Sequence, residues 1–271
     1  MIKRLSISLV LVGLFCSSVF SAQNTTKWVN KFGQAPGGVE TTATDIWPLS
    51  EGTPTQQIYV APTEARLHNI ISTSANDDGS PVGTGARTVR IWGLKTWSDF
   101  ETSEDVTMDG TSSVATANSY VFINRMKVLT NGTTSINVGE LSATAQTDGS
   151  ISAVIAVNKG QTQQAIYAIP STQNFHVKCF YGDINKSQGA AATIIYEIMA
   201  NESPDVSELN VNFIGKMTRG VQSTGSSSKD WPQDPPIIIP GPAIIKMQGT
   251  ASTGDVEGSA GFSGVLVSND N

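Results

Sequence analysis

The stretch Arg87–Leu94, RTVRIWGL, alternates apolar and polar side chains with the period of a β-strand. In an extended chain successive side chains point to opposite faces, so a strand here has two distinct sides. One face of the predicted strand carries Arg87, Val89 and Ile91, and the other face carries Thr88, Arg90 and Trp92. Alternation of this kind is typical of a strand that is buried on one side only.

Similar runs recur from residue 55 onward, separated about every 8 to 15 residues by clusters of Gly, Asn, Asp or Pro. Beyond the N-terminus, no segment keeps a helical period over ten or more residues. We therefore expect an all-β fold, an antiparallel β-sandwich or jelly-roll-like arrangement, with few or no helices beyond the N-terminal leader. The predicted strands are Gln57–Val60, Arg66–Thr73, Arg87–Leu94, Glu104–Met108, Tyr120–Leu129, Ile136–Val138, Ile151–Val157, Gln164–Ile169, Phe175–Tyr181, Ala192–Met199, Val211–Met217, Ala243–Gln248 and Gly261–Val267.

Three dipeptides, Asp109-Gly110, Asn131-Gly132 and Asp148-Gly149, predict hairpin turns because Gly accepts a positive φ. The block at 231–242, WPQDPPIIIPGP, cannot form a central strand, since proline lacks the N–H that a ladder needs. We expect it to be an extended crossover or an edge segment. The preceding Ser223–Lys229, STGSSSK, reads as a flexible loop.

The N-terminus has the layout of a secretory signal peptide, with Lys3 and Arg4 before an apolar run. Residues 1–21 form the predicted leader, with cleavage near Ser21. A membrane anchor and a mature N-terminal segment remain as alternatives, although the uncharged run of about 16 residues is short for a span. Residues 22–54 are expected to be an extended arm, and residues 55–271 a β-sandwich domain, either in one piece or as two packed sub-sheets.

The charge of the chain argues against nucleic-acid binding. The formal net charge is −6 and the isoelectric point is about 4.9, and no run of basic residues occurs. Phosphate backbones are bound by clustered Lys and Arg. No nucleic-acid partner is therefore expected.

The residue types that carry catalysis are sparse. His68, His176 and Cys179 are the strong metal ligands beyond the leader, and His176 and Cys179 would face opposite sides of a regular strand. Cys179 is expected to be a structural thiol and His68 a satisfied or exposed side chain. GFSGV at 261–265 lacks the pattern of a nucleophile elbow. We expect no catalytic, cofactor-binding or metal-binding residues and no cofactor, hence no enzyme.

Two further features have a structural and a functional interpretation. Asn76–Gly79, NDDG, resembles the start of a calcium loop, but the later carboxylate ligands are missing, so we expect a solvated turn. The tryptophans could form a sugar-stacking platform, although packing in a core or an interface is the better expectation. They are Trp92 and Trp97, with Trp47 and Trp231 elsewhere in the chain.

The central block resembles a family of virion proteins of tailed bacteriophages, many of them from marine bacteria. The motifs that carry the resemblance are Ser74–Asp77 (SAND), Gly83–Val89 (GTGARTV), Gly93-Leu94 and Val106–Thr111, with weaker likeness at Gly160–Pro170 and Gly261–Asn269. The resemblance covers roughly residues 40–270 and implies no catalytic residues. Within the block, we expect Gly83 and Gly85 to allow a close backbone approach, and Arg87 to hold a loop through Asp77 or Asp78.

The resemblance implies a non-enzymatic virion structural protein, a capsid-surface decoration, head fibre or tail-associated component that acts through subunit contacts. The expected partners are further copies of the chain, with a trimer among the possible states, and other virion proteins such as the major capsid protein. A host-surface glycan is a further candidate partner. The alternative is a secreted, extracellular carbohydrate-binding or adhesin β-sandwich module, which the leader and the low surface charge would suit.

Overall fold

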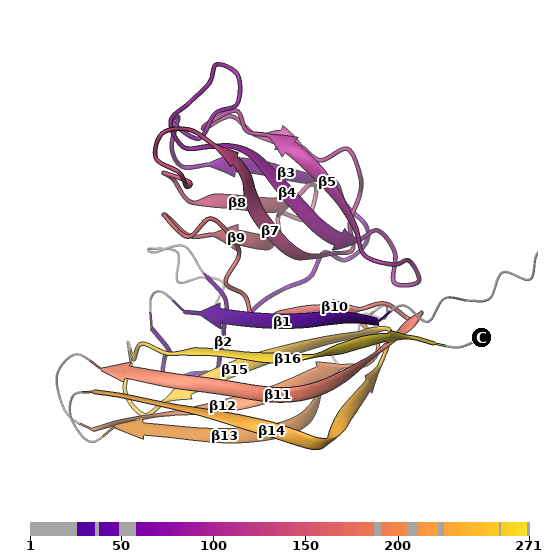
Figure 1. Ribbon diagram of the computed structural model, residues 1–271, viewed down its shortest axis with the longest axis vertical. Helices are drawn as coiled ribbons and strands as arrows, with labels where there is room; N and C mark the ends of the chain where they lie inside the picture. The colour runs from indigo at the N-terminus through magenta and orange to yellow at the C-terminus, as the bar shows by residue number, and fades with distance from the viewer. Residues whose placement is uncertain are drawn as a thin grey trace, which may run out of the picture.

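The computed structural model describes residues 26–35, 38–48, 58–186, 191–204, 211–221, 225–254 and 256–269. The described residues form sixteen strands in four antiparallel sheets and contain no helix (Figure 1). The prediction of an all-β, antiparallel chain is thereby confirmed. The predicted leader at residues 1–21 lies outside the described residues.

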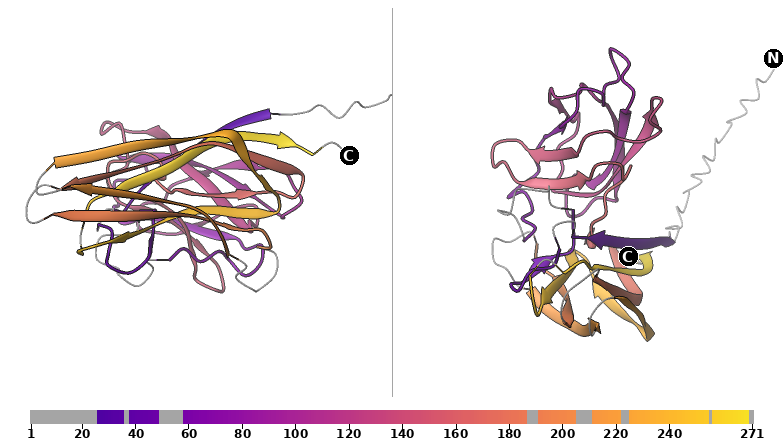
Figure 2. Two further views of the ribbon diagram at one scale, coloured as in Figure 1. Left: turned by 90° about the horizontal axis from the view of Figure 1, so that it is seen from below. Right: turned by 90° about the vertical axis from the view of Figure 1, so that its left-hand side faces the viewer.

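Two of the sheets combine the N-terminal segment with the C-terminal half of the chain. The first sheet has the order β1 (Thr26–Gln34), β16 (Ser259–Ser268), β11 (Gln173–Lys186) and β14 (Gly225–Pro240). The second has the order β10 (Ile166–Ile169), β15 (Ala243–Ala251), β12 (Ala192–Asn201) and β13 (Val211–Val221), with β2 (Thr44–Asp45) paired to β15. We call these two sheets the terminal region; its long strands run side by side in the view from below (Figure 2).

The middle of the chain forms the other two sheets, which we call the central region. One sheet has the order β6 (Val114–Ala115), β3 (His68–Ser72), β8 (Leu141–Ala145) and β9 (Ile151–Ile155). The other has the order β5 (Thr102–Thr107), β4 (Ala86–Leu94) and β7 (Phe122–Asn131). The chain thus starts in the terminal region, builds the central region and returns.

Each region has its own hydrophobic core, made by side chains from both of its sheets. In the terminal region Phe175 and Phe262 of one sheet lie in the same buried cluster as Tyr196 and Ile245 of the other. In the central region a second cluster includes Ile70, Val89, Ile91, Met126 and Leu141. Burial of this much apolar surface is the main favourable term for folding.

A third cluster joins the two regions. Trp47, fully buried, packs edge-on against Tyr59 with ring centroids 5.3 Å apart, and Phe122 of β7 and Ile166 of β10 belong to the same cluster. Strand β1 also lies along the boundary between the regions (Figure 1). Two features therefore connect the regions: the apolar cluster around Trp47, and strand β1, which lies between them.

Most predicted strands exist, and the differences have local causes. Ile136–Val138 is not a strand, because the buried Asn137 side chain takes up local backbone groups: it donates to the Gly139 and Ala156 carbonyls and accepts from the Gly160 N–H. Residues 58–60 are not a strand, and Gln57 lies outside the described residues.

The proline-rich block belongs to β14, the edge strand of its sheet, so the expectation of an edge segment is confirmed. Immediately after it the chain enters the other sheet at Ala243. The prediction of a flexible loop at Ser223–Lys229 is wrong over its described part, because residues 225–229 pair with β11 at the start of β14.

One of the three predicted hairpins connects two paired strands of one sheet. Asp148-Gly149 turns between the paired strands β8 and β9, with Gly149 at φ 72°. Asp109-Gly110 also forms a tight turn, with Gly110 at positive φ and an isolated antiparallel bridge between Asp109 and Ser112. The strands on either side of it, β5 and β6, lie in different sheets. The Asn131-Gly132 prediction is wrong, since β7 and β8 do not pair and the Gly132 N–H donates to the Gly85 carbonyl.

The Asp77 carboxylate organises the loops of the central region. Fully buried, it accepts hydrogen bonds from the backbone N–H groups of Ala86, Val138 and Gly139, at 2.7 to 2.9 Å, and from the Ser72 hydroxyl. A Cβ at Gly85 would collide with this carboxylate, which confirms the expected close approach.

Two expectations for this loop are wrong. Arg87 forms no ion pair with Asp77 or Asp78 in the described structure; its Nε donates to the Gly83 carbonyl instead. Asp77 is also not part of a solvated turn, because backbone amides replace water around its carboxylate.

We predict that Asp77→Asn lowers the free energy of unfolding by on the order of 3 kcal/mol, because an amide NH2 would face backbone donors inside the protein. Urea denaturation followed by circular dichroism measures the change. The matched control is Asp78→Asn, whose part-buried carboxylate accepts one bond from the Ser80 N–H, and which should cost less than about 1 kcal/mol. Equal losses in the two variants would contradict the role assigned to Asp77.

Candidate functional site

The residues considered for metal binding or catalysis are dispersed. His68 is fully buried in β3, with its Nδ1 3.0 Å from the Arg66 carbonyl and its Nε2 2.8 Å from the Ser152 hydroxyl. His176 and Cys179 lie in β11 of the other region. Within the described ranges, no three His, Cys, Asp or Glu side chains gather closely enough to hold a metal ion.

His176 and Cys179 share a face of β11, contrary to the expectation from regular alternation. A bulge between Val177 and Cys179 shifts the register by one residue. Val177 and Phe180 both point into the core, so His176 and Cys179 lie on the outer side. Burial raises the pKa of the Cys179 thiol, which disfavours a reactive thiolate.

The tryptophans do not form one platform. Trp47 is in the core, in agreement with the expectation that the tryptophans pack there. Trp231 packs near Phe180, with ring centroids 6.2 Å apart. Trp97 packs against the cluster between the regions. Trp92 differs, because it lines a cavity.

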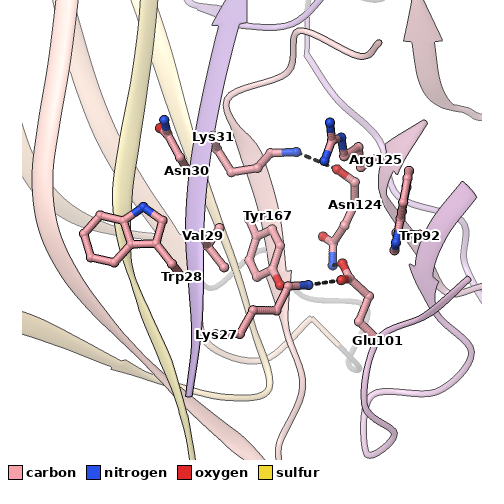
Figure 3. Close-up of a pocket in the computed structure, with 10 residues that line it drawn as sticks. All are labelled: Lys27, Trp28, Val29, Asn30, Lys31, Trp92, Glu101, Asn124, Arg125 and Tyr167. Atoms are coloured by element: carbon pink, nitrogen blue, oxygen red, sulfur yellow. Dashed lines mark hydrogen bonds and ion pairs between the residues drawn. The ribbon is translucent and has the colours of Figure 1, made fainter. Parts of the chain in front are cut away.

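That cavity lies at the junction of the two regions and is the candidate site. It has a volume of about 210 Å³, and its wall combines β1 with β4, β7 and β10 (Figure 3). We call it the junction cavity. Its lining residues are Lys27, Trp28, Val29, Asn30, Lys31, Trp92, Glu101, Asn124, Arg125 and Tyr167.

The alternation of β1 places its two lysines on the cavity side. Lys27, Val29 and Lys31 point toward the central region, and Trp28 points away from it (Figure 3). Nine consecutive pairs with β16, from Thr26 opposite Val267 to Gln34 opposite Ser259, hold the strand in this register. A slip by one residue would therefore remove both lysines from the cavity.

A polar network spans the junction. Lys27 forms an ion pair with Glu101, and Glu101 accepts a bond of 2.9 Å from the Asn124 side-chain amide. The Asn124 side chain also accepts from the Ala168 N–H at 2.8 Å. Buried Asn124 thus connects β7, the Glu101 loop and the strand β10 of the terminal region.

Lys31 is the unusual charge in this network. Its side chain is almost fully buried, and its Nζ donates to the Asn124 backbone carbonyl. Burial lowers its pKa to about 7; Glu101 opposes this shift, whereas Arg125 and Lys27 add to it. Lys31 is therefore partly deprotonated at neutral pH.

Two further side chains set the chemistry of the cavity. The Arg125 guanidinium lies 5.1 Å from the centre of the Trp92 ring and donates to the Gln161 side-chain oxygen at 2.6 Å. In the described structure the buried Tyr167 hydroxyl has no hydrogen-bond partner, and burial raises its pKa well above its ordinary value. It remains a neutral O–H group that can donate or accept.

Sequence reasoning missed this site almost entirely. Residues 26–34 were expected to belong to an extended arm, and the polar residues of β1 on both faces give no amphipathic pattern. The partners of Lys27 and Lys31 lie 74 and 93 residues along the chain. The one local signal for a strand is the even spacing of Trp28 and Phe32, which places both aromatic side chains on one face of an extended chain.

The chain has no match among models of protein families, and none among curated proteins. No helix that could span a membrane is found in the described part of the chain.

Acid should destabilise the protein through His68. Burial lowers its pKa to about 4 from an ordinary value near 6.5, so the unfolded chain binds a proton more readily than the folded chain. Its stabilising contribution is complete above about pH 6.5 and is lost toward pH 4, a loss of on the order of 3 kcal/mol. We predict a flatter decline of the free energy of unfolding below pH 6.5 in His68→Gln. Parallel curves for the two proteins from pH 7 to pH 4 would contradict this.

Lys31 should cost stability at neutral pH, because the unfolded chain holds its proton up to about pH 10.5 and the folded chain only to about pH 7. We predict that Lys31→Met raises the free energy of unfolding at pH 7 by about 1 to 3 kcal/mol, and that this gain shrinks as the pH rises toward 10. Thermal unfolding at several pH values measures it. Lys27→Met, at an exposed side chain of the same strand face, is the control and should show no such gain. A destabilised Lys31→Met at pH 7 would contradict the prediction.

Proposed function

We propose that this chain is a non-enzymatic structural protein of a virion, placed on the particle exterior and acting through contacts with further copies of itself and with other virion proteins. The resemblance of the central block to phage virion proteins motivates the proposal. We also propose that each pair of sheets is a β-sandwich of the jelly-roll-like kind, which the shared core clusters support.

The observation that carries the proposal is the outward face of the sheet β1-β16-β11-β14. Residues directly opposite on paired strands share a face, so Trp28, Val265, His176 and Ile238 form one row across four strands. Trp28 is 61% exposed and Ile238 56%.

The neighbouring rows extend this surface without charge. They consist of Thr26, Val267, Asn174 and Pro240 on one side, and of Asn30, Ser263, Cys179 and Pro232 on the other. Exposed Lys178, the extra residue of the bulge, lies beside them. A surface with large apolar side chains and few charges resembles the centre of a protein–protein interface. We call these three rows the outer sheet face.

The alternative, a secreted carbohydrate-binding or adhesin module, is favoured by one observation, the tryptophan and polar side chains that line the junction cavity. The two functions differ in where the protein is found. Mass spectrometry of purified particles and of culture supernatant, including the N-terminal peptide, separates them. Recovery from particles supports the virion role, whereas a soluble product that begins near Ala22 and is absent from particles overturns it.

We predict that the outer sheet face drives self-association. Replacement of Trp28 and Ile238 by Ser should shift the purified protein from an oligomer to a monomer in sedimentation velocity, because the centre of the contact loses its apolar area. Val82→Ser, at a residue 65% exposed in a loop of the central region, is the control and should leave the oligomer intact. An unchanged oligomer in the double variant would contradict the assignment of this face.

A further inference from the structure

We propose that the junction cavity binds a small acidic sugar, one monosaccharide unit that carries a carboxylate or sulfate, and that the oxyanion lies between Lys31 and Arg125. The inference stands apart from the structural role, since it concerns a cavity inside one chain.

The positive side of the cavity is incompletely neutralised. The Lys31 amino group and the Arg125 guanidinium point toward one another (Figure 3). Their hydrogen bonds go to neutral oxygens, the Asn124 carbonyl and the Gln161 amide. In the described structure, neither cation forms an ion pair with a carboxylate. An oxyanion between them would gain charge-assisted hydrogen bonds from both.

The rest of the wall suits the polar and apolar parts of a sugar ring. Trp92 contributes apolar ring atoms to the wall, and each Glu101 carboxylate oxygen, bound once by Lys27 or by Asn124, can accept a further hydrogen bond from a ligand hydroxyl. The Tyr167 hydroxyl points into the cavity toward the Lys27–Glu101 pair and has no partner among the described residues (Figure 3). A buried hydroxyl without a partner costs free energy that a ligand hydroxyl would recover.

The size of the cavity limits the ligand to a single unit. Pockets for drug-sized molecules have volumes of about 300 to 1,000 Å³, and the junction cavity, at about 210 Å³, is smaller. One hexose ring with its acidic group fits this scale. Longer glycans would extend outward from the mouth of the cavity.

The charge on Lys31 makes binding depend on pH. The charged groups that face Lys31 are Glu101, Arg125 and Lys27, and together with burial they leave its pKa at about 7. An anion prefers the protonated lysine, so the affinity should fall as the pH rises above 7, by up to about tenfold per pH unit. Tyr167 stays neutral over this range and does not contribute to the dependence.

The test is isothermal titration calorimetry of the full chain with glucuronic acid, a glucose sulfate and neutral glucose, at about pH 6 and about pH 9. The two acidic sugars distinguish carboxylate from sulfate recognition, and glucose tests the need for a charge. We expect saturable binding of at least one acidic sugar at the lower pH, at least tenfold weaker binding at the higher pH, and none of glucose.

Variants test the residues. Arg125→Gln should weaken binding at least tenfold. Arg90→Gln is the matched control, because Arg90 also lies over Trp92 but pairs with Asp105 outside the cavity lining, and its binding should equal that of the wild type. Tyr167→Phe should bind several-fold more weakly and unfold no more readily than the wild type, which separates a ligand contact from a structural role.

The proposal is overturned if neither acidic sugar binds, if glucose binds as tightly as they do, or if Arg125→Gln binds like the wild type. None of these results bears on whether the protein is present in particles, so failure here and failure of the virion role are distinguishable.

Discussion

The arrangement of the two regions depends on strand β1, which pairs with β16 and carries a buried lysine to the place where two hydrophobic cores meet. Strand β1 completes the sheet of the terminal region through its pairing with β16, and the same strand places Lys31 against the Asn124 carbonyl of β7. A buried ammonium group is unfavourable unless it is paired or loses its proton, and its lowered pKa reflects that cost. Since Trp47 and Phe122 already provide an apolar contact between the regions, the junction does not need a lysine for packing. The anion binding proposed for the junction cavity would account for a costly charge at such a place.

A second buried charge has the opposite character. The Asp77 carboxylate accepts hydrogen bonds from three backbone N–H groups, so it stabilises the loops that contain them. Few of its lone pairs are left to accept a hydrogen bond from a ligand. Lys31 and Arg125 each have N–H groups left that can donate to a ligand. Because their present partners are neutral oxygens, their positive charges are not balanced by a carboxylate. This difference in remaining hydrogen-bonding capacity distinguishes the structural node from the candidate site.

The sequence predicted those features that depend on neighbouring residues. Alternation identified β4, where Val89 and Ile91 are buried, and Asp148-Gly149 identified the β8–β9 turn. Strand β8, LSATA, escaped notice because its buried Ala143 and Ala145 are small and weak strand formers. The bulge that brings His176 and Cys179 to one face has no local signature. The junction cavity could not be predicted from the sequence, because Lys31, Trp92 and Tyr167 come together only through the order of the strands. Local sequence patterns do not encode that order.

The titration of the Lys31 side chain tests this arrangement most directly. Nuclear magnetic resonance of the protein with isotope-labelled lysine Cε, with the Lys31 signal assigned by its loss in Lys31→Met, follows the protonation of each lysine separately. Burial between β1 and β7 predicts a midpoint at about pH 7 for Lys31. A midpoint near its ordinary value of 10.5 would show that Lys31 is solvated and that β1 does not close the junction over it.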